Sequence, residues 1–351
     1  MTPAPDGSTG ERIVKRPSNK LHEAIDRLAG ARIGVVGDLV ADLYVSGLSD
    51  RVSREAPVLI VRYEQQWLRP GGAANVAANL AALGATARVV GLVGDDVPGK
   101  SLIEVLTGVR APGRVSCDGI VVTPGRETIS KTRYLAGAKL TSRQQVLRLD
   151  RQPPAPPGDT LLAALADRIR LTDPHVDAWI ASDYGYGAFD DAMRNLLRQI
   201  AAAKCVVADS RWELERFTGM TVVKPNEEEA EILGRRLGLA AADTGDLAQR
   251  LADRLDARSV LVTLGNQGMV LAADGRVVRI PACGADEIVD LTGAGDSVAA
   301  ALAAALAGGA DVETAARLAN CAGVVVVMKE GAATASPAEL HDAVDRAEPL
   351  P

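Results

Sequence analysis

The stretch Asp290-Leu291-Thr292-Gly293-Ala294-Gly295-Asp296-Ser297 precedes an alanine-rich segment that carries no further charge as far as residue 307. The two glycines let backbone N–H groups crowd together at the positive end of a predicted helix over 294–307, where an anion binds well. We interpret this loop as a phosphate cradle, with Asp296 in the first helical turn ready to accept a proton from an alcohol. The alternative that the loop alone leaves open is an acid that only compensates the helix dipole.

On both sides of this loop, apolar strands and helical segments alternate along the chain. Short apolar runs at 31–36, 87–93, 177–182, 204–208 and 258–263 are separated by segments with helical spacing, which is typical of βαβ units in a parallel sheet. Apolar residues make up 47% of the chain and aromatic residues 3%, so we expect a core of Ala, Val and Leu. We predict one α/β domain over 21–346, a flexible arm over 1–20 and a tail over 347–351.

Two segments interrupt this alternation. Residues 39–69 and 118–149 contain runs with a period of two, which predicts exposed strands and hairpins. We expect these two segments to pair into one small accessory sheet beside the main domain.

Charge and cysteine usage exclude several classes of protein. The 351 residues carry 39 Lys and Arg against 45 Asp and Glu, a net charge of −6, and no long basic run, so a nucleic-acid partner is not expected. The N-terminus lacks the apolar core of a signal peptide or membrane anchor, which favours a cytoplasmic protein without a membrane partner.

The four cysteines show no metal-binding spacing, since no C-x-x-C pair is present. We therefore expect reduced, mostly buried thiols at Cys117, Cys205, Cys283 and Cys321.

A second glycine loop, Gly94-Asp95-Asp96-Val97-Pro98-Gly99-Lys100-Ser101, fits the G-x-x-x-x-G-K-[ST] pattern of P-loop NTPases. Pro98 has no N–H to offer a phosphate, and Asp95 and Asp96 would repel one. We therefore disfavour the P-loop interpretation. Instead, we expect one of the two acids to cap a surface helix whose first turn contains Pro98.

Two signatures give the chain a family resemblance. DLTGAGDS at 290–297 resembles the C-terminal signature of the PfkB/ribokinase-type carbohydrate kinases, and PGGAANVAANLAALGA at 70–85 resembles their N-terminal signature. The resemblance extends from about residue 31 to residue 344. It implies a three-layer α/β/α ribokinase-like fold with a mainly parallel central sheet and a small β-sheet lid, which matches the accessory strands predicted above.

Within the family, the segments SREAPV (53–58), TISKTR (128–133), QQVLRLD (144–150) and ASDYGYG (181–187) look most like the kinases of D-glycero-D-manno-heptose 7-phosphate. This resemblance implies transfer of the ATP γ-phosphoryl group, with Mg²⁺, to the anomeric hydroxyl, giving the 1,7-bisphosphate for lipopolysaccharide precursor synthesis. Such kinases are often fused to a nucleotidyltransferase domain, which we expect to be absent here because the chain ends soon after the kinase region. Three alternatives stay open: a PfkB-type kinase for another sugar, sugar phosphate or nucleoside, a non-catalytic sugar-binding regulator, and a P-loop NTPase.

The resemblance also implies residue roles. Asp296 would be the base, with the amides of Gly293, Ala294 and Gly295 as the anion hole. Asn226 and Glu229 match an N-x-x-E element that orders magnesium and its waters, although an Asn cap followed by acids in the first helical turn gives the same pattern. Sugar-binding positions are Asp38, Asp42, Gly71, Gly72 and Asn75; nucleotide-binding positions are Asn226, Thr263, Gly265, Gly268 and Asn320; a potassium loop would contain Asp290, Thr292 and Ser336.

A phosphorylated sugar needs cations. Lys131 and Arg133 fall on one face of a predicted lid strand, and Arg148 is a further candidate, although basic residues on exposed strands also serve as solvated edge protection. The chain departs from the heptose-kinase patterns Asp-Tyr-x-Lys-Gly and Asp-Pro-Lys, since it has Tyr186 and Arg211 at the two lysine positions. The exact sugar is therefore the least determined feature. A potassium requirement and a homodimer through the lid are also left open.

Overall fold

The computed structural model describes residues 17–139, 142–284 and 289–347. In these residues the main sheet has nine strands in the order β13-β12-β11-β10-β9-β8-β1-β4-β5. The strands from β11 to β5 pair in parallel, and β12 and β13 add an antiparallel hairpin. Their bounds are β1 (Arg32–Gly37), β4 (Thr86–Gly94), β5 (Arg114–Thr123), β8 (Ala178–Asp183), β9 (Cys205–Ser210), β10 (Val222–Val223), β11 (Ser259–Thr263), β12 (Met269–Ala273) and β13 (Arg276–Ile280).

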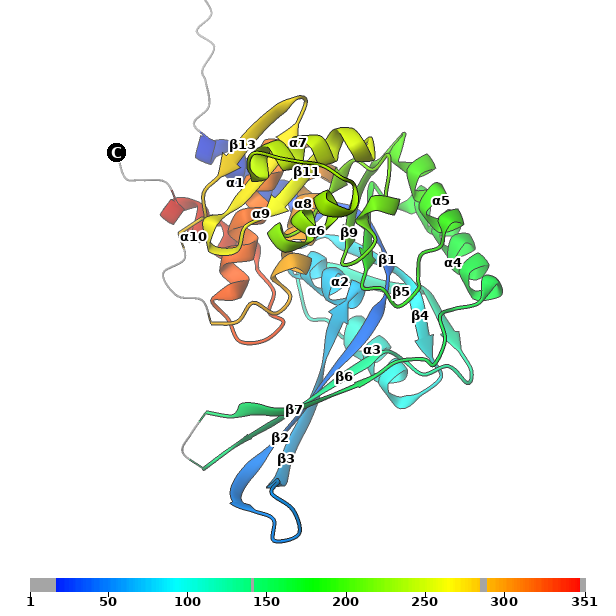
Figure 1. Ribbon diagram of the computed structural model, residues 1–351, viewed down its shortest axis with the longest axis vertical. Coiled ribbons are helices and arrows are strands. Elements are labelled where there is room, and N and C mark those ends of the chain that lie inside the picture. The colour runs from blue at the N-terminus through cyan, green and yellow to red at the C-terminus, as the bar shows by residue number, and fades with distance from the viewer. Residues whose placement is uncertain (1–16, 140–141, 285–288, 348–351) are drawn as a thin grey trace, which may run out of the picture.

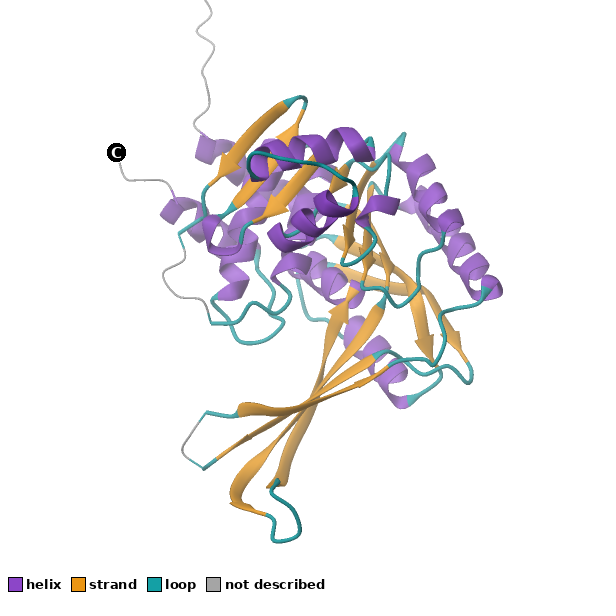
Figure 2. Cartoon of the chain, in the orientation of Figure 1, coloured by secondary structure: helices purple, strands orange, loops and turns teal. Residues whose placement is uncertain are grey.

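Helices cover both faces of this sheet (Figures 1 and 2), and each face has its own buried apolar cluster. The predicted three-layer α/β/α fold is therefore confirmed. One face holds α2 (Ala73–Ala82), α3 (Val97–Thr107), α8 (Ala294–Ala307) and α9 (Val312–Val327), with α1 (Pro17–Arg27) and α10 (Pro337–Ala347) packed outside; the other holds α4 (Asp159–Thr172), α5 (Asp191–Ala201), α6 (Glu227–Arg236) and α7 (Thr244–Leu255).

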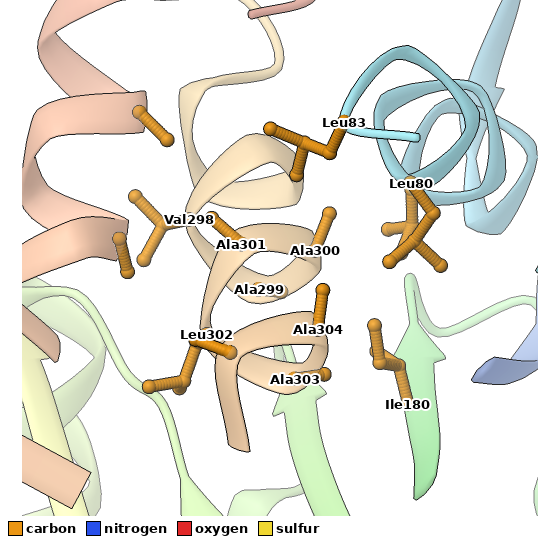
Figure 3. Close-up of a cluster of buried hydrophobic side chains, with 14 of the residues drawn as sticks. Leu80, Leu83, Ile180, Val298, Ala299, Ala300, Ala301, Leu302, Ala303 and Ala304 are labelled. Atoms are coloured by element: carbon orange, nitrogen blue, oxygen red, sulfur yellow. The ribbon is translucent and has the colours of Figure 1, made fainter. Parts of the chain in front are cut away.

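The alanine-rich helix α8 lies in the middle of the first helical layer. Figure 3 shows its alanines beside Leu80 of α2, Leu83 at the end of that helix and Ile180 of β8. Residues 299–305 of α8 are at most 1% exposed. Small side chains let this helix approach its neighbours closely, so the core closes with few aromatic residues. This packing holds the N-terminus of α8, and hence Asp296, in a defined place.

Four strands form the lid, a second sheet with the order β3-β2-β6-β7: β2 (Leu39–Val52), β3 (Leu59–Gly72), β6 (Ser130–Gly137) and β7 (Gln144–Arg151). It extends as a long arm away from the helix-covered body (Figure 1). The predicted accessory sheet is confirmed, but its second segment begins at residue 130, not 118. Residues 118–123 lie in β5, which pairs in parallel with β4 because Gly119 and Ile120 are buried at the edge of the large sheet.

The chain ends differ from the predicted bounds. Helix α1 begins at Pro17 and packs against α9 and α10, so residues 17–20 are helical and do not belong to a flexible arm. Residue 347 is the last of α10, so it belongs to that helix and not to the predicted tail. The remainder of the predicted arm, 1–16, and of the tail, 348–351, lie outside the described residues. Among the described helices, none is both long enough and apolar enough to cross a membrane.

The prediction of four reduced cysteines is wrong for one pair. Cys283 and Cys321 form a disulfide, with Cα atoms 5.2 Å apart, because the segment after β13 runs alongside α9. Such bonds are uncommon in the reducing cytoplasm that the sequence favoured. Cys117 and Cys205 are free and half-buried, as predicted. Burial raises the pKa of Cys117 to about 11 and that of Cys205 to about 12, so neither thiol is poised as a nucleophile.

Candidate active site

The site lies at the carboxyl edge of the large sheet, where parallel strands present their functional groups together. Asp38 follows β1, Asp183 ends β8, Asp209 lies in β9 and Lys224 follows β10. The lid strands β2 and β3 start and end at the same edge, beside the residues that open α2. The N-terminus of α8 is also held here, since Asn75 of α2 contacts Asp296 of α8. Polar groups from six elements therefore meet in one place.

Asp296 is a buried acid of this group, at 4% exposed. Its Oδ2 accepts a hydrogen bond from Asn75 Nδ2 at 2.6 Å, and its Oδ1 accepts one from the Tyr184 hydroxyl at 2.7 Å. Burial raises the pKa of Asp296 to about 6, and these two hydrogen bonds limit the rise. A carboxylate that is ionised at neutral pH, yet has its pKa near the working pH, suits a general base.

The predicted anion hole lies at the start of α8. Gly293 adopts a φ of 79°, and a Cβ there would lie 2.6 Å from Asn75 Nδ2, so glycine is required. Of the predicted amides, that of Ala294 is engaged, because it donates to the Leu291 carbonyl at 3.3 Å. Within the described chain, the backbone N–H groups of Gly295 and Asp296 have no hydrogen-bond partner. The Lys224 ammonium lies 3.6 Å from where a Cβ of Gly295 would be. Free amides and a cation thus lie close together at the start of α8, and both favour an anion there.

Lys224 is a site residue that the sequence reasoning missed. Its ammonium forms an ion pair with Asp209 at 3.0 Å, and its side chain is only 4% exposed. Burial alone would lower the pKa of Lys224, but the carboxylates of Asp209, Glu229 and Asp296 outweigh it and raise that pKa. The signal was a single lysine directly after the apolar pair Val222–Val223, where a surface lysine is not expected.

A cavity of about 120 Å³ lies beside the N-terminus of α8. It brings together four predicted nucleotide-binding residues, Thr263, Gly265, Gly268 and Asn320, and its apolar walls include Leu291, Val298, Val324 and Val327. Asn320 also donates to the carbonyl of Pro281 at 2.7 Å. It therefore lines the cavity and also binds the backbone of the segment after β13. The mixture of apolar walls and a few polar groups suits a flat heterocycle.

Asn226 and Glu229 form a capping box at the start of α6. Asn226 Oδ1 accepts from the N–H of Glu229 at 2.8 Å, and Glu229 Oε2 accepts from the N–H of Asn226 at 2.9 Å. The capping interpretation of this motif is therefore confirmed. In the described part of the chain, no three His, Cys, Asp or Glu side chains cluster so as to enclose a metal. These residues fit an ion held mainly by phosphates and water, with Glu229 in its outer shell.

On the lid side, Asp42 and Arg133 bind each other. Arg133 donates to Asp42 Oδ1 at 2.7 Å, and their side chains are 14% and 8% exposed. A Cβ at Gly71 would lie 2.9 Å from Asp42 Oδ2, so the glycine makes room for this carboxylate. Gly72, with a φ of 58°, lies against the carbonyl of Asp38. Arg133 is therefore not a free cation, and its contact with a substrate phosphate stays a prediction.

Asp38 organises the loop after β8. Its Oδ2 accepts from the backbone N–H groups of Tyr184 at 2.8 Å and Tyr186 at 3.1 Å. Burial, together with the nearby charge of Asp183, raises the pKa of Asp38 to about 7 against these hydrogen bonds. The loop departs from the heptose-kinase pattern at Tyr186, and this position faces the charges of Asp38, Asp150, Arg148 and Arg211.

The remaining lid cations differ in their partners. Arg148 pairs with Asp150 at 2.5 Å on β7. Lys131 has no ion pair among the described residues, and its Nζ lies 5.6 Å from the centre of the Tyr184 ring. Burial lowers the pKa of Lys131. Of the three predicted phosphate contacts, Lys131 is thus the one that no described carboxylate engages.

The predicted potassium loop is only partly assembled. Asp290 accepts from the N–H of Thr292 and from that of Gly331, each at 2.9 Å, so its carboxylate ties two loops together. Ser336 instead binds Glu339 at the start of α10, with its hydroxyl 2.8 Å from Oε2.

The Gly94–Ser101 loop is a helix cap. Asp96 accepts from the N–H of Gly99 at 2.9 Å and caps α3, which has Pro98 in its first turn. Lys100 pairs with Asp95 at 2.8 Å on the surface. The capping interpretation is therefore confirmed.

We accordingly expect Lys100→Ala to leave ATP affinity unchanged within about twofold, because its ammonium is engaged with Asp95 and an exposed pair contributes little. Isothermal titration of ATP into the wild type and the variant measures this. A loss of ATP binding in a folded Lys100→Ala variant would restore the P-loop interpretation.

The fold and this site define a class of protein. The family model of the pfkB family carbohydrate kinases matches residues 31–339, and the chain belongs to that family. It is 40% identical over 336 residues to the bifunctional protein HldE of Paramagnetospirillum magneticum, which covers 93% of this chain and 66% of that protein. It is 39% identical to the bifunctional protein HldE of Caulobacter vibrioides, with 89% and 63% covered. The chain thus spans slightly less than two thirds of the length of these relatives.

Solved structures show the same fold at lower identity. The structure of Arabidopsis thaliana ribokinase complexed with ribose and ATP matches with a TM-score of 0.65 at 20% identity, covering 90% of this chain and 98% of that one. Phosphofructokinase-2 from Escherichia coli in complex with potassium matches with a TM-score of 0.68 at 18% identity, covering 90% and 99%. The ribokinase-like architecture expected from the two signatures is therefore confirmed.

Proposed function

We propose that this chain is an ATP-dependent kinase that phosphorylates the anomeric hydroxyl of D-glycero-D-manno-heptose 7-phosphate. The observation that carries the proposal is the buried carboxylate of Asp296 beside the Lys224 ammonium and two backbone N–H groups that no described residue engages. Support for the sugar comes from the lid and loop motifs that resemble heptose 7-phosphate kinases and from relatives that are HldE proteins. Because ATP is a cytoplasmic co-substrate, the proposal also places the enzyme in the cytoplasm.

In this mechanism, Asp296 accepts the proton of the acceptor hydroxyl as its oxygen bonds to the γ-phosphorus. The bond from the γ-phosphorus to the β-phosphate oxygen breaks, and ADP leaves. The free amides at the start of α8 and the Lys224 ammonium face the charge that develops on the transferring group. The cavity lined by Thr263, Gly268 and Asn320 would hold the adenine.

Two ions belong to the proposal. Mg²⁺ bound to the nucleotide would neutralise phosphate charge, with Glu229 and Asn226 orienting its waters. Potassium at the Asp290 and Thr292 loop would act through the Gly331 segment that Asp290 holds.

A coupled assay of ADP release tests the assigned substrate. We expect kcat/KM to be highest for heptose 7-phosphate among a panel with free heptose, ribose, fructose 6-phosphate and a nucleoside. A clear preference for another acceptor would keep the kinase and overturn the heptose assignment. No ADP release with any acceptor, in protein that binds ATP, would favour the sugar-binding regulator.

Substitutions of two lid cations test whether the enzyme recognises the phosphate group of its sugar substrate. Lys131→Ala should lower kcat/KM for heptose 7-phosphate by about tenfold or more and leave free heptose nearly unchanged, because a charge-assisted contact is worth about 1.5–3 kcal/mol. Arg133→Ala should impair both sugars, because it leaves Asp42 buried without its partner. Equal losses for both sugars in Lys131→Ala would contradict its role toward the phosphate.

We also propose that two copies associate through the outer face of the lid, the face opposite Lys131 and Arg133. Strand alternation puts Tyr134, Leu147 and Leu149 on this outer face, and the two leucines are 56% and 42% exposed. All eight residues of β7 are exposed, so its edge is open to pairing. A four-stranded sheet with uncovered apolar side chains fits an identical sheet from a second copy.

Light scattering during size exclusion tests the association. We expect a dimer in the wild type and a monomer in the double variant Leu147→Glu/Leu149→Glu, because charges on both faces of the interface repel. Leu171→Glu is the matched control, since Leu171 is 66% exposed on α4 of the body. A wild-type monomer would overturn the dimer without affecting the kinase.

A further inference from the structure

A tyrosine contacts the proposed base directly. The Tyr184 hydroxyl lies 2.7 Å from Asp296 Oδ1, while Asn75 Nδ2 lies 2.6 Å from Oδ2. Each carboxylate oxygen of Asp296 therefore holds one donor. An oxygen of a carboxylate accepts two hydrogen bonds, so each retains room for a substrate hydroxyl.

The fold, and not a chance rotamer, sets the place of this tyrosine. The backbone N–H of Tyr184 is held by Asp38, and that of Gly185 is held by Asp183 Oδ1 at 2.9 Å. Asp183 Oδ2 in turn accepts from the Ser210 hydroxyl at 2.7 Å. Gly185 has a φ of 81°, and a Cβ there would lie 2.8 Å from the Trp212 ring. Two buried carboxylates and a required glycine thus fix the direction in which the phenol points.

The phenol acts as a donor toward Asp296. Burial and the charge of Asp296 raise the pKa of Tyr184 well above its usual value, so the hydroxyl keeps its proton at every working pH. Three titratable groups face Asp296: Tyr184 from the loop after β8, Asp209 from β9 and Lys224 from the end of β10. Of these, Tyr184 alone donates a hydrogen bond to it. Hydrogen bonds to the charged form favour that form.

We propose that Tyr184 is a positioning residue that keeps Asp296 ionised and oriented toward the acceptor hydroxyl, a role that rests on the proposed kinase function. The hydroxyl proton of the sugar passes to Asp296, the new oxygen–phosphorus bond forms and the bond to ADP breaks. Tyr184 retains its own proton throughout and only stabilises the carboxylate.

The surroundings of Tyr184 dictate which variant isolates this role. Lys131 lies over its ring, so truncation of the ring would remove that contact as well as the hydroxyl. Tyr184→Phe keeps the ring and removes the hydroxyl alone. Tyr63→Phe is the matched control, because it makes the same deletion at a tyrosine of β3 that is 60% exposed.

The pH dependence of turnover separates positioning from a structural role. We expect kcat of Tyr184→Phe to be roughly tenfold below wild type at pH 6 and within about threefold at pH 8.5. Loss of the Tyr184 hydroxyl raises the pKa of Asp296, so the decline of kcat on acidification begins at a higher pH. KM for ATP should not change, and Tyr63→Phe should match the wild type throughout. A loss that is equal at both pH values, or no loss, would overturn the proposal.

A measurement without substrate distinguishes failure of this inference from failure of the proposed function. Infrared pH-difference spectra report protonation of Asp296, and its band is assigned as the one that Asp296→Asn removes. We expect the titration midpoint in Tyr184→Phe to lie above that of the wild type, whatever sugar the enzyme uses. An unchanged midpoint overturns the role of Tyr184, whereas a raised midpoint in a protein that phosphorylates no sugar overturns the proposed kinase instead.

Discussion

Asp296→Asn is expected to lower kcat by roughly 10²–10⁴-fold, the usual contribution of a positioned general base. The amide is nearly the same size and can keep one contact with Asn75 or Tyr184, but it cannot take the proton of an alcohol. ATP and sugar binding should therefore persist. The measurement combines steady-state turnover with isothermal titration of both ligands.

The wild type offers a second test of the same residue. Burial raises the pKa of Asp296 to about 6, so kcat/KM should decline as pH falls through this value and the carboxylate becomes protonated. Asp296→Asn should lack this limb in whatever residual activity remains. Near-normal turnover in a folded Asp296→Asn variant would show that Asp296 is not the general base.

Lys224→Met is expected to lower the free energy of unfolding by about 3 kcal/mol, because it leaves the Asp209 carboxylate, whose side chain is only 20% exposed, without its partner. The same change removes the cation beside Gly295, so turnover should fall as well. Urea unfolding followed by circular dichroism measures the stability.

The double variant Asp209→Asn/Lys224→Met is the control for this prediction. It removes both charges, so it should recover much of the lost stability but not the lost turnover. If Lys224→Met were as stable as the wild type, the ion pair between Lys224 and Asp209 would not stabilise the fold. If the double variant recovered turnover, Lys224 would not act on the transferring group.

The helices and strands around the site were predictable because their signals are local. The alanine-rich segment after Gly293 predicted a helix over 294–307, and α8 has these bounds. Asp96 and Asn226 cap helices, as expected for an acid before Pro98 and an Asn before three glutamates. A hydrophobic period and a cap involve residues only a few positions apart, so their sequence alone carries the information.

The bounds of the lid were less predictable. Residues 118–123 have the same alternation as the lid strands, yet they pair with β4 in the large sheet. The two-residue strand β10 was missed because Val222–Val223 is too short to show a period. Which sheet a strand joins depends on the strand it pairs with. Alternation with a period of two predicts a strand but does not identify that partner.

The sequence by itself determined the α/β class, the two glycine signatures and thereby the position of the proposed base. Only the tertiary structure decided which side chains meet: Tyr184 with Asp296, Lys224 with Asp209, Arg133 with Asp42, and Cys283 with Cys321. The partners in these pairs come from different strands or helices and lie 15 to 112 residues apart along the chain. Their meeting depends on strand order and crossover connections, which bring the carboxyl ends of separate parallel strands to one edge.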